Sequence, residues 1–239
     1  MTSETSDSLP QPQVLAVRRE GAGIPAVYWA PAGASRGVVL ACHGGSGHKT
    51  SNAILLIARA CLPLGLTVLA IDGPVHGERR ADGNLDPVEA RLKFREAWRA
   101  GVGRTSMGED MRAALDALQR QPPCADLPVG YIGVSMGTAY GIPMLAVEPR
   151  IRAAAIGLWS TTYAASEHLA GFASRIGCDL WFTQQWDDEF FDRQGTLDLF
   201  DAIGSEDKRL VVYPGPHREL DGERLADAVA FVAGRLLKD

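Results

Sequence analysis

The sequence lacks basic runs and paired cysteines, and each absence argues against a class of function. Its 239 residues carry 24 Lys and Arg against 29 Asp and Glu, a formal net charge of -5. Without a basic stripe to follow a phosphate backbone, we expect no nucleic-acid partner. No CxxC pair occurs among the four cysteines, which argues against a zinc site and a dense disulfide framework. These are Cys42, Cys61, Cys124 and Cys178.

Long apolar runs are also absent. No segment approaches the roughly 20 apolar residues that a membrane-spanning helix needs. The polar, acidic residues at the start do not resemble a secretory signal. We therefore expect a soluble, cytoplasmic protein with reduced thiols and no membrane association. Hydrophobic residues make up 46% of the chain and charged residues 22%, which is enough apolar material for a sizeable core.

Strand-like and helix-like patterns alternate along most of the chain. This alternation predicts a doubly wound, mostly parallel, eight-stranded sheet with helices on both faces. The expected strands are 14–19, 24–29, 37–42, 66–71, 129–134, 151–158, 179–183 and 209–213, the first two joined by a turn at 21–23. The expected helices are 51–61, 88–100, 104–120, 135–147, 163–174, 195–203 and 219–237.

The domain organisation follows from the same pattern. Residues 1–12 read as a flexible tail, and residues 13–239 as a single domain. The charged segment 74–103 interrupts the alternation and is expected to be an excursion near the strand ends. Residues 159–177 leave room only for a short helix, so any cap over the sheet is expected to be small.

A serine motif stands at one strand-to-helix junction. Gly133-Val134-Ser135-Met136-Gly137 has the form G-x-S-x-G, directly after an expected strand and before an expected helix. Small flanking residues permit the strained turn that raises a serine hydroxyl above the carboxyl edge of a sheet. The position therefore indicates a nucleophile, although the same five letters in a loop would mean little.

With this motif the chain resembles the α/β-hydrolase fold superfamily, and within it the smaller serine esterases and dienelactone-hydrolase-like members. The resemblance extends from about residue 14 to the end, and serine precedes acid and histidine as in that superfamily. It rests on His43-Gly44-Gly45, on residues 72–79 (DGPVHGER), on the turn around Ser135, on Trp186-Asp187-Asp188 and on Pro214-Gly215-Pro216-His217.

A serine nucleophile needs a base and a carboxylate that orients the base. His217 follows the last expected strand in a Pro-Gly-Pro loop and is the best candidate for the base. The family pattern points to Asp188 as the carboxylate, with Asp187 as the alternative. The resemblance further implies that the backbone N–H groups of Gly45 and Met136 form the oxyanion hole.

Six further residues are candidates for the pocket. They are His43, Gly44, His48, His76, Trp159 and Trp186. His43 and His76 also match family positions that bond loop backbone. The 74–103 excursion could also cover the site, and its possible substrate contacts are Arg79, Arg80, Arg91, Arg95, Trp98 and Arg99.

The expected activity is hydrolysis of a small carboxylic ester or thioester through an acyl-enzyme on Ser135. The same triad also serves C–C bond hydrolysis, acyl transfer and perhydrolysis. A non-enzymatic ligand sensor on this fold is the other alternative. No metal or cofactor is expected, because the histidines are scattered and the chemistry requires none. The sequence leaves open whether copies associate as a homo-oligomer.

Overall fold

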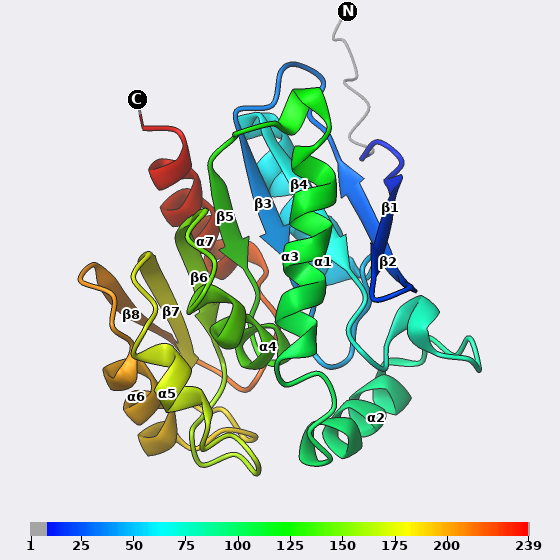
Figure 1. Ribbon diagram of the computed structural model, residues 1–239. Helices are drawn as coiled ribbons and strands as arrows, with labels where there is room; N and C mark the ends of the chain where they lie inside the picture. Colours follow the sequence, from blue (N-terminus) through cyan, green and yellow to red (C-terminus); the bar gives the residue numbers. More distant parts are fainter. Residues whose placement is uncertain (1–8, 239) are drawn as a thin grey trace, which may run out of the picture.

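The computed structural model describes residues 9–238 and contains one open sheet of eight strands. Along the sheet the strand order is β1-β2-β4-β3-β5-β6-β7-β8 (Figure 1). The strands are β1 Gln13–Arg19, β2 Ala22–Trp29, β3 Gly37–Ala41, β4 Leu66–Ile71, β5 Val129–Ile132, β6 Ile151–Gly157, β7 Asp179–Gln185 and β8 Lys208–Tyr213. The helices are α1 Asn52–Cys61, α2 Pro87–Arg99, α3 Ser106–Gln119, α4 Met136–Leu145, α5 Leu169–Ala173, α6 Arg193–Ala202 and α7 Gly222–Leu236.

The expected sheet is confirmed. Strands β3 to β8 pair in parallel, and β1 and β2 form an antiparallel hairpin at one edge. In β3, β4 and β5 every residue is buried, which explains their unbroken apolar runs. The hairpin turn is Glu20–Gly21 instead of residues 21–23, because two residues with positive φ (52° and 83°) suffice to reverse the chain.

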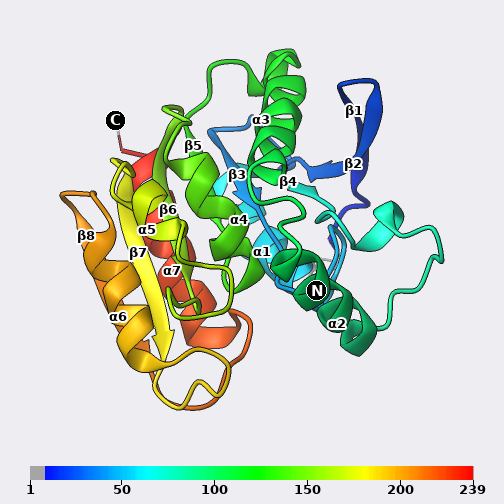
Figure 2. The same ribbon diagram turned by 60° about the horizontal axis from the view of Figure 1, so that its bottom comes forward.

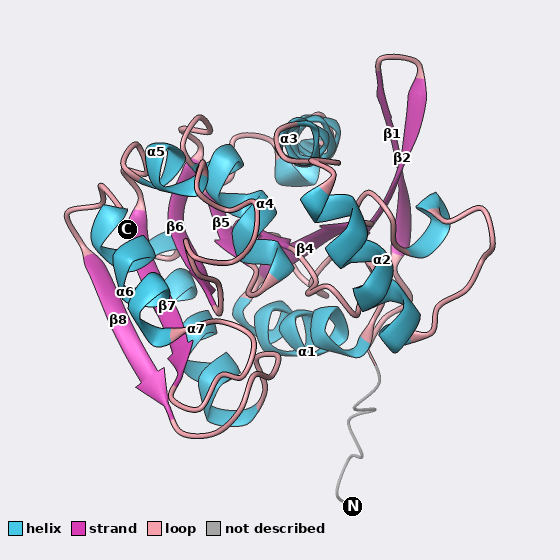
Figure 3. Ribbon diagram, turned by 90° about the horizontal axis from the view of Figure 1, so that it is seen from below, coloured by secondary structure: helices cyan, strands magenta, loops and turns pink. Residues whose placement is uncertain are grey.

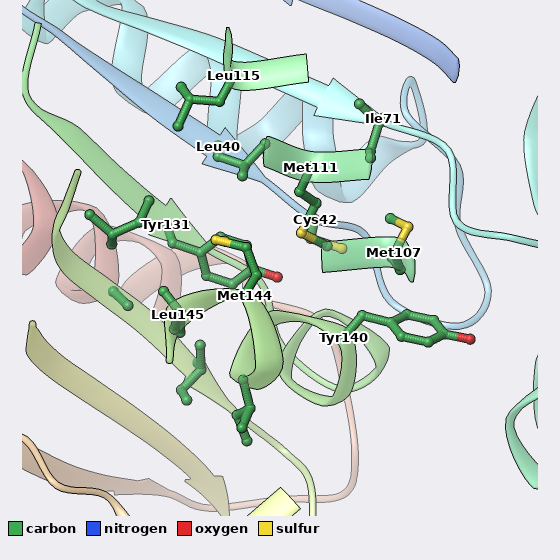
Figure 4. Packing of buried hydrophobic residues seen from close by; sticks show 14 of the residues in the cluster. Leu40, Cys42, Ile71, Met107, Met111, Leu115, Tyr131, Tyr140, Met144 and Leu145 are labelled. Carbon is green, nitrogen blue, oxygen red and sulfur yellow. The ribbon is translucent and has the colours of Figure 1, made fainter. Parts of the chain in front are cut away.

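Two apolar layers hold the helices against the sheet. Helices α1 and α7 pack on one face, and α3 to α6 pack on the other. Figure 4 shows part of the second layer, which contains Met107 and Met111 of α3, Met144 of α4 and Tyr131 of β5. All ten residues of α4 are buried, so this helix lies in the middle of the core.

Two helices begin three or more residues later than the sequence-based expectation. The helix predicted over 163–174 is confined to Leu169–Ala173, because the preceding residues bond to distant parts of the chain. Trp98 donates its indole N–H to the Ala164 carbonyl at 3.0 Å. The last helix begins at Gly222 instead of Glu219, since Asp221 is extended (φ −146°, ψ 169°). Glu219 therefore lies in the loop after β8.

Part of the predicted tail, residues 1–8, lies outside the described residues. Residues 9–12 precede β1 without regular secondary structure, and Leu9 is partly buried against the layer that contains α1 and α7. Between residues 9 and 238, none of the helices combines the length and apolar character required to cross a membrane.

The carboxyl ends of the parallel strands meet at one edge of the sheet. Figure 2 brings this edge forward, and Figure 3 views it end-on, with α2 beside it. The loops after β3, β4, β5, β7 and β8 all emerge there. Open α/β sheets place their ligand sites at this edge.

A buried ion pair anchors the loop after β4. The carboxylate of Asp72 is fully buried and accepts hydrogen bonds from the Lys49 backbone N–H and Nζ, both at 2.8 Å, and from the Glu78 N–H at 2.9 Å. Burial pushes the pKa of Asp72 upward, but the bonds from Lys49 and Glu78 outweigh it and hold this pKa below its usual value. The loops after β3 and β4 are thereby tied together.

Two buried histidines support the same loops. His43 Nε2 accepts the Gly73 N–H at 3.0 Å, and its Nδ1 donates to the Gly44 carbonyl at 2.8 Å. His76 Nε2 donates to the Gly45 carbonyl at 3.0 Å. Burial lowers the pKa of His43 to about 3 and that of His76 to about 4. Both rings are therefore neutral at physiological pH.

We expect the free energy of unfolding to fall as pH drops from about 6.5 to about 4. In the unfolded chain both histidines gain protons near pH 6.5, whereas in the folded protein they resist protonation. The unfolded state then binds more protons than the folded state. The free energy of unfolding therefore falls by roughly 1 kcal/mol per pH unit for each histidine. Urea unfolding over this range measures the slope. His76→Gln should reduce it by about half, and an unchanged slope would contradict the assignment.

Removing the cation beside Asp72 should be costly. Lys49→Met leaves a fully buried carboxylate without its charged partner, for which we expect a loss of about 3–5 kcal/mol in the free energy of unfolding. Lys93→Met is the control. The Lys93 side chain is exposed, and its Nζ lies 3.9 Å from Glu96 Oε2, so this variant should lose less than about 1 kcal/mol in the free energy of unfolding. Equal losses in urea titrations would show that the buried pair has no special weight.

Candidate active site

Ser135 occupies a strained turn between β5 and α4. Its backbone has φ 57° and ψ −120°, a conformation that non-glycine residues rarely adopt. The Ser135 N–H donates to the Gly157 carbonyl at 2.9 Å, which ties the turn to β6. A β-carbon at Gly137 would lie 2.9 Å from the Cys42 carbonyl oxygen. The glycine therefore lets the start of α4 approach the end of β3 closely.

His217 and Asp188 meet at the ends of the last two strands. His217 Nδ1 lies 2.8 Å from Asp188 Oδ2. The other carboxylate oxygen, Oδ1, accepts the backbone N–H groups of Phe190 at 2.9 Å and Phe191 at 3.1 Å. The carboxylate is thus held in one orientation. Because the carboxylate accepts a hydrogen bond from Nδ1–H of the neutral imidazole, Nε2 of His217 is left as the basic nitrogen.

Asp187 has a different environment. Its side chain accepts the Gly215 N–H at 3.2 Å and is exposed. Glu189, the next acid along the chain, accepts the backbone N–H of His217 at 2.8 Å. Of the two aspartates that the sequence left open, the structure brings Asp188 to the imidazole and uses Asp187 to hold the loop that carries it.

A cavity of about 230 Å³ lies at this edge of the sheet. Ser135, His217 and Gly45 all border it. Its remaining walls are mainly aromatic and charged side chains, namely Ser46, Arg91, Phe94, Arg95, Trp159, Tyr163, Glu189, Phe190, Phe191, Arg218 and Glu219. An aromatic enclosure of this size accommodates a small organic group, and Ser135 lies on its surface.

Helix α2 forms one side of the cavity. Its inner face carries Phe94, which is buried, while Arg91 and Arg95 lie over the ring of Phe190 at 5.6 and 4.9 Å. These two arginines are the members of the 74–103 segment that the sequence suggested and that do border the cavity. Arg79 instead pairs with Asp110 at 2.8 Å, outside it.

The candidate oxyanion side lies between two loops. Gly45 borders the cavity, and Met136 directly follows Ser135 as the first residue of α4. Backbone N–H groups in the first turn of a helix have no acceptor within the helix. A β-carbon at Gly45 would lie 2.8 Å from the ring of Phe94, so a glycine is required for this close approach.

The six other pocket candidates are placed unevenly. Trp159 borders the cavity, and the other five do not. His43 and His76 lie buried under the loops, and His48 Nδ1 is 3.1 Å from the hydroxyl of Thr50. Gly44 packs against the carboxyl group of Glu219.

Trp186 lies outside the cavity, contrary to the expectation of a pocket role. Its side chain is 52% exposed, and the Arg193 guanidinium stacks on its ring at 3.7 Å. The residue follows the end of β7, where the loop turns the indole outward.

Sequence reasoning missed several residues that border the cavity. Phe190 and Phe191 belong to the loop after Asp188, and both rings lie within 5.4 Å of the His217 ring. Phe94 had a detectable signal, since Phe94 and Trp98 share one face of an expected helix. Glu219 was assigned to a helix and given no role.

Comparison with solved structures places the chain in a family. A cold-adapted esterase from an Arctic intertidal metagenomic library, in complex with PEG, matches with a TM-score of 0.81 and 34% identity over 99% of this chain and 100% of that chain. A dienelactone hydrolase from Anabaena variabilis matches with a TM-score of 0.67 at 19% identity, over 95% and 97% of the two chains. No protein-family model and no curated protein matches the chain.

A third structure shares the fold at low identity. The 2,6-dihydroxy-pseudo-oxynicotine hydrolase has a TM-score of 0.73 at 17% identity, over 95% of this chain and 68% of that chain. At such identities the likeness shows the fold alone, whereas the Arctic esterase is similar in sequence along its whole length. The chain therefore belongs to the α/β-hydrolase superfamily, among its esterases.

Proposed function

We propose that the protein is a serine esterase that cleaves small carboxylic esters or thioesters through an acyl-enzyme on Ser135. The observation that carries the proposal is the shared cavity, in which a strained serine and a carboxylate-bound histidine face the same space. A serine hydroxyl is weakly nucleophilic at neutral pH and requires such a base. The esterase relatives support ester hydrolysis in general.

In the first half of the reaction, Ser135 Oγ attacks the carbonyl carbon of the substrate while His217 Nε2 accepts the hydroxyl proton. Asp188 keeps the imidazole in the required tautomer and stabilises the imidazolium. The tetrahedral intermediate carries its negative charge on the former carbonyl oxygen. As it collapses, the bond to the alcohol or thiol breaks, and the proton on Nε2 passes to the leaving group.

In the second half, water replaces the alcohol. His217 takes a proton from the water as it attacks the acyl carbon, and the collapse of the second intermediate returns a proton to Ser135 Oγ. The acid product then leaves the cavity. Backbone N–H groups of Gly45 and Met136 are the proposed donors to the oxyanion in both halves, each worth a few kcal/mol in the transition state.

The cavity favours a small substrate. Its volume of about 230 Å³ and its walls of Phe94, Trp159 and Phe191 fit a short acyl chain or a compact ring. A long acyl chain would have to extend beyond this cavity. Short-chain esters are therefore the first substrates to assay.

Ser135→Ala should abolish turnover without unfolding the protein. The change removes one oxygen, and the turn depends on the neighbouring glycines rather than on the hydroxyl. Wild-type protein incubated with a fluorophosphonate should gain the mass of one adduct, and the variant should gain none. Hydrolysis of p-nitrophenyl acetate by the variant at the wild-type rate would contradict the mechanism. Absence of an adduct on the wild type would favour a ligand-sensing protein.

Asp188→Asn should lower kcat by roughly 10³–10⁴-fold, because the amide oxygen keeps the bonds from the Phe190 and Phe191 N–H groups and the NH2 group then faces Nδ1. The imidazole is held in the tautomer that carries its proton on Nε2, which cannot act as a base. Asp187→Asn is the matched control, one residue away and also in the loop after β7. Its amide oxygen can still accept the Gly215 N–H, so the change should cost less than about tenfold in kcat. Steady-state kinetics with the same ester decide, and a reversed order of the two losses would transfer the role to Asp187.

A further inference from the structure

A second carboxyl group borders the cavity beside the proposed oxyanion hole, and the mechanism above does not use it. Glu219 lies in the loop between β8 and α7, two residues after His217. It is partly buried and shares the cavity surface with Ser135, His217 and Gly45. The group is therefore available to a bound substrate.

The carboxyl group packs on the loop that follows β3. A β-carbon at Gly44 would lie 2.9 Å from Cδ of Glu219 and even closer to one carboxyl oxygen. The absence of a side chain at Gly44 makes room for this group. Because Gly45 is the next residue, the carboxyl group is held on the side of the cavity where the oxyanion is expected.

No ionic or hydrogen-bonding partner neutralises Glu219 among residues 9–238. Arg218, its neighbour, pairs with Asp221 at 2.5 Å, and no bond joins Glu219 to the other charged groups of the cavity. From α2 these are Arg91 and Arg95, which lie over Phe190. From the loop after β7 it is Glu189, and from its own loop it is His217. His43, in the loop below, is neutral.

The protonation state follows from this environment. Burial raises the pKa of Glu219 to about 7, and a positive charge on His217 opposes the rise. Burial removes water that would stabilise the charged form, and no described partner replaces that water. Near neutral pH a large fraction of the Glu219 side chains therefore carries a proton. In that form it is a hydrogen-bond donor.

We propose that Glu219 acts in turnover as a neutral carboxylic acid whose O–H donates a hydrogen bond to the substrate oxygen on the oxyanion side of the cavity. The inference rests on the proposed esterase function. A neutral donor stabilises the negative charge that develops on this oxygen, whereas an ionised carboxylate repels it. No bond to Glu219 forms or breaks, and its proton stays on the carboxyl group. Ionisation of Glu219 accordingly sets the alkaline limit of activity.

The test compares pH profiles of kcat and kcat/KM for p-nitrophenyl acetate in wild type and Glu219→Gln. For the wild type we expect a fall of about tenfold or more between about pH 7 and pH 9. The amide of Glu219→Gln still donates but cannot ionise, so its activity should persist through the alkaline range. Glu219→Leu lacks the donor and should lose about 10²-fold in kcat at the wild-type optimum.

Glu223→Gln is the matched control, an exposed acid four residues further along in the first turn of α7. It should reproduce the wild-type profile. Difference infrared spectroscopy gives a second readout, because a protonated carboxyl band that titrates near pH 7 should be present in the wild type and absent from Glu219→Gln.

Two outcomes would overturn the proposal. One is an alkaline decline that is unchanged in Glu219→Gln, and the other is a wild-type profile that stays flat to about pH 9. Either result, obtained with an enzyme that Ser135→Ala inactivates, removes the role of Glu219 and leaves the esterase mechanism standing. Activity that survives Ser135→Ala would instead remove the esterase mechanism itself.

Discussion

The close approach of three strand ends around Ser135 is the constraint on which the rest of the site depends. The serine adopts an unfavourable backbone conformation, which persists only because its surroundings fix it. The Gly157 carbonyl holds its N–H from one side, and Cys42 at the end of β3 packs on Gly137 from the other. A β-carbon at Gly157 would lie 2.6 Å from the Thr183 nitrogen, so the backbones of β6 and β7 also approach each other closely at this point.

The remaining parts of the site are supported in different ways. The loops after β3 and β4 stand on buried polar groups, with Asp72 and Lys49 joined at 2.8 Å and two neutral histidines bonded to backbone. Hydrogen bonds join the loops after β7 and β8, since Asp188 bonds to the imidazole of His217 and Glu189 accepts the backbone N–H of His217. Buried hydrogen bonds and a buried ion pair therefore fix the loops after β3 and β4, whereas partly exposed hydrogen bonds fix the loops after β7 and β8.

Much of the fold could be predicted from the sequence because its signals are local. Strands buried on both faces read as unbroken apolar runs, and β4 was predicted to the residue at Leu66–Ile71. The position of Ser135 followed from glycines on both sides of it. The aromatic walls could not be predicted in this way, because Phe190 and Phe191 reach the cavity only through the turn that Asp188 imposes on its own loop. Trp186 shows the converse, since its orientation depends on the stacking of Arg193.

Glu219 and the start of α7 illustrate the same limit. The pattern of residues 219–237 fits a helix, but the extended backbone at Asp221 delays its start to Gly222. A shift of one turn converts a helix residue into a cavity residue. Boundaries of this kind depend on capping geometry and not on hydrophobic periodicity.

Helix α2 is attached to the molecule by a narrow strip of side chains. Ala90, Phe94, Ala97 and Trp98 are its buried residues, and the rest of its surface is at least partly open to water. The hydrogen bond that ties the Ser135 turn to β6 and the close contact of Gly137 with Cys42 do not involve this helix. Evolution or protein engineering could therefore replace α2 with another segment. Such a change would alter which acyl groups enter the cavity and would keep the proposed reaction.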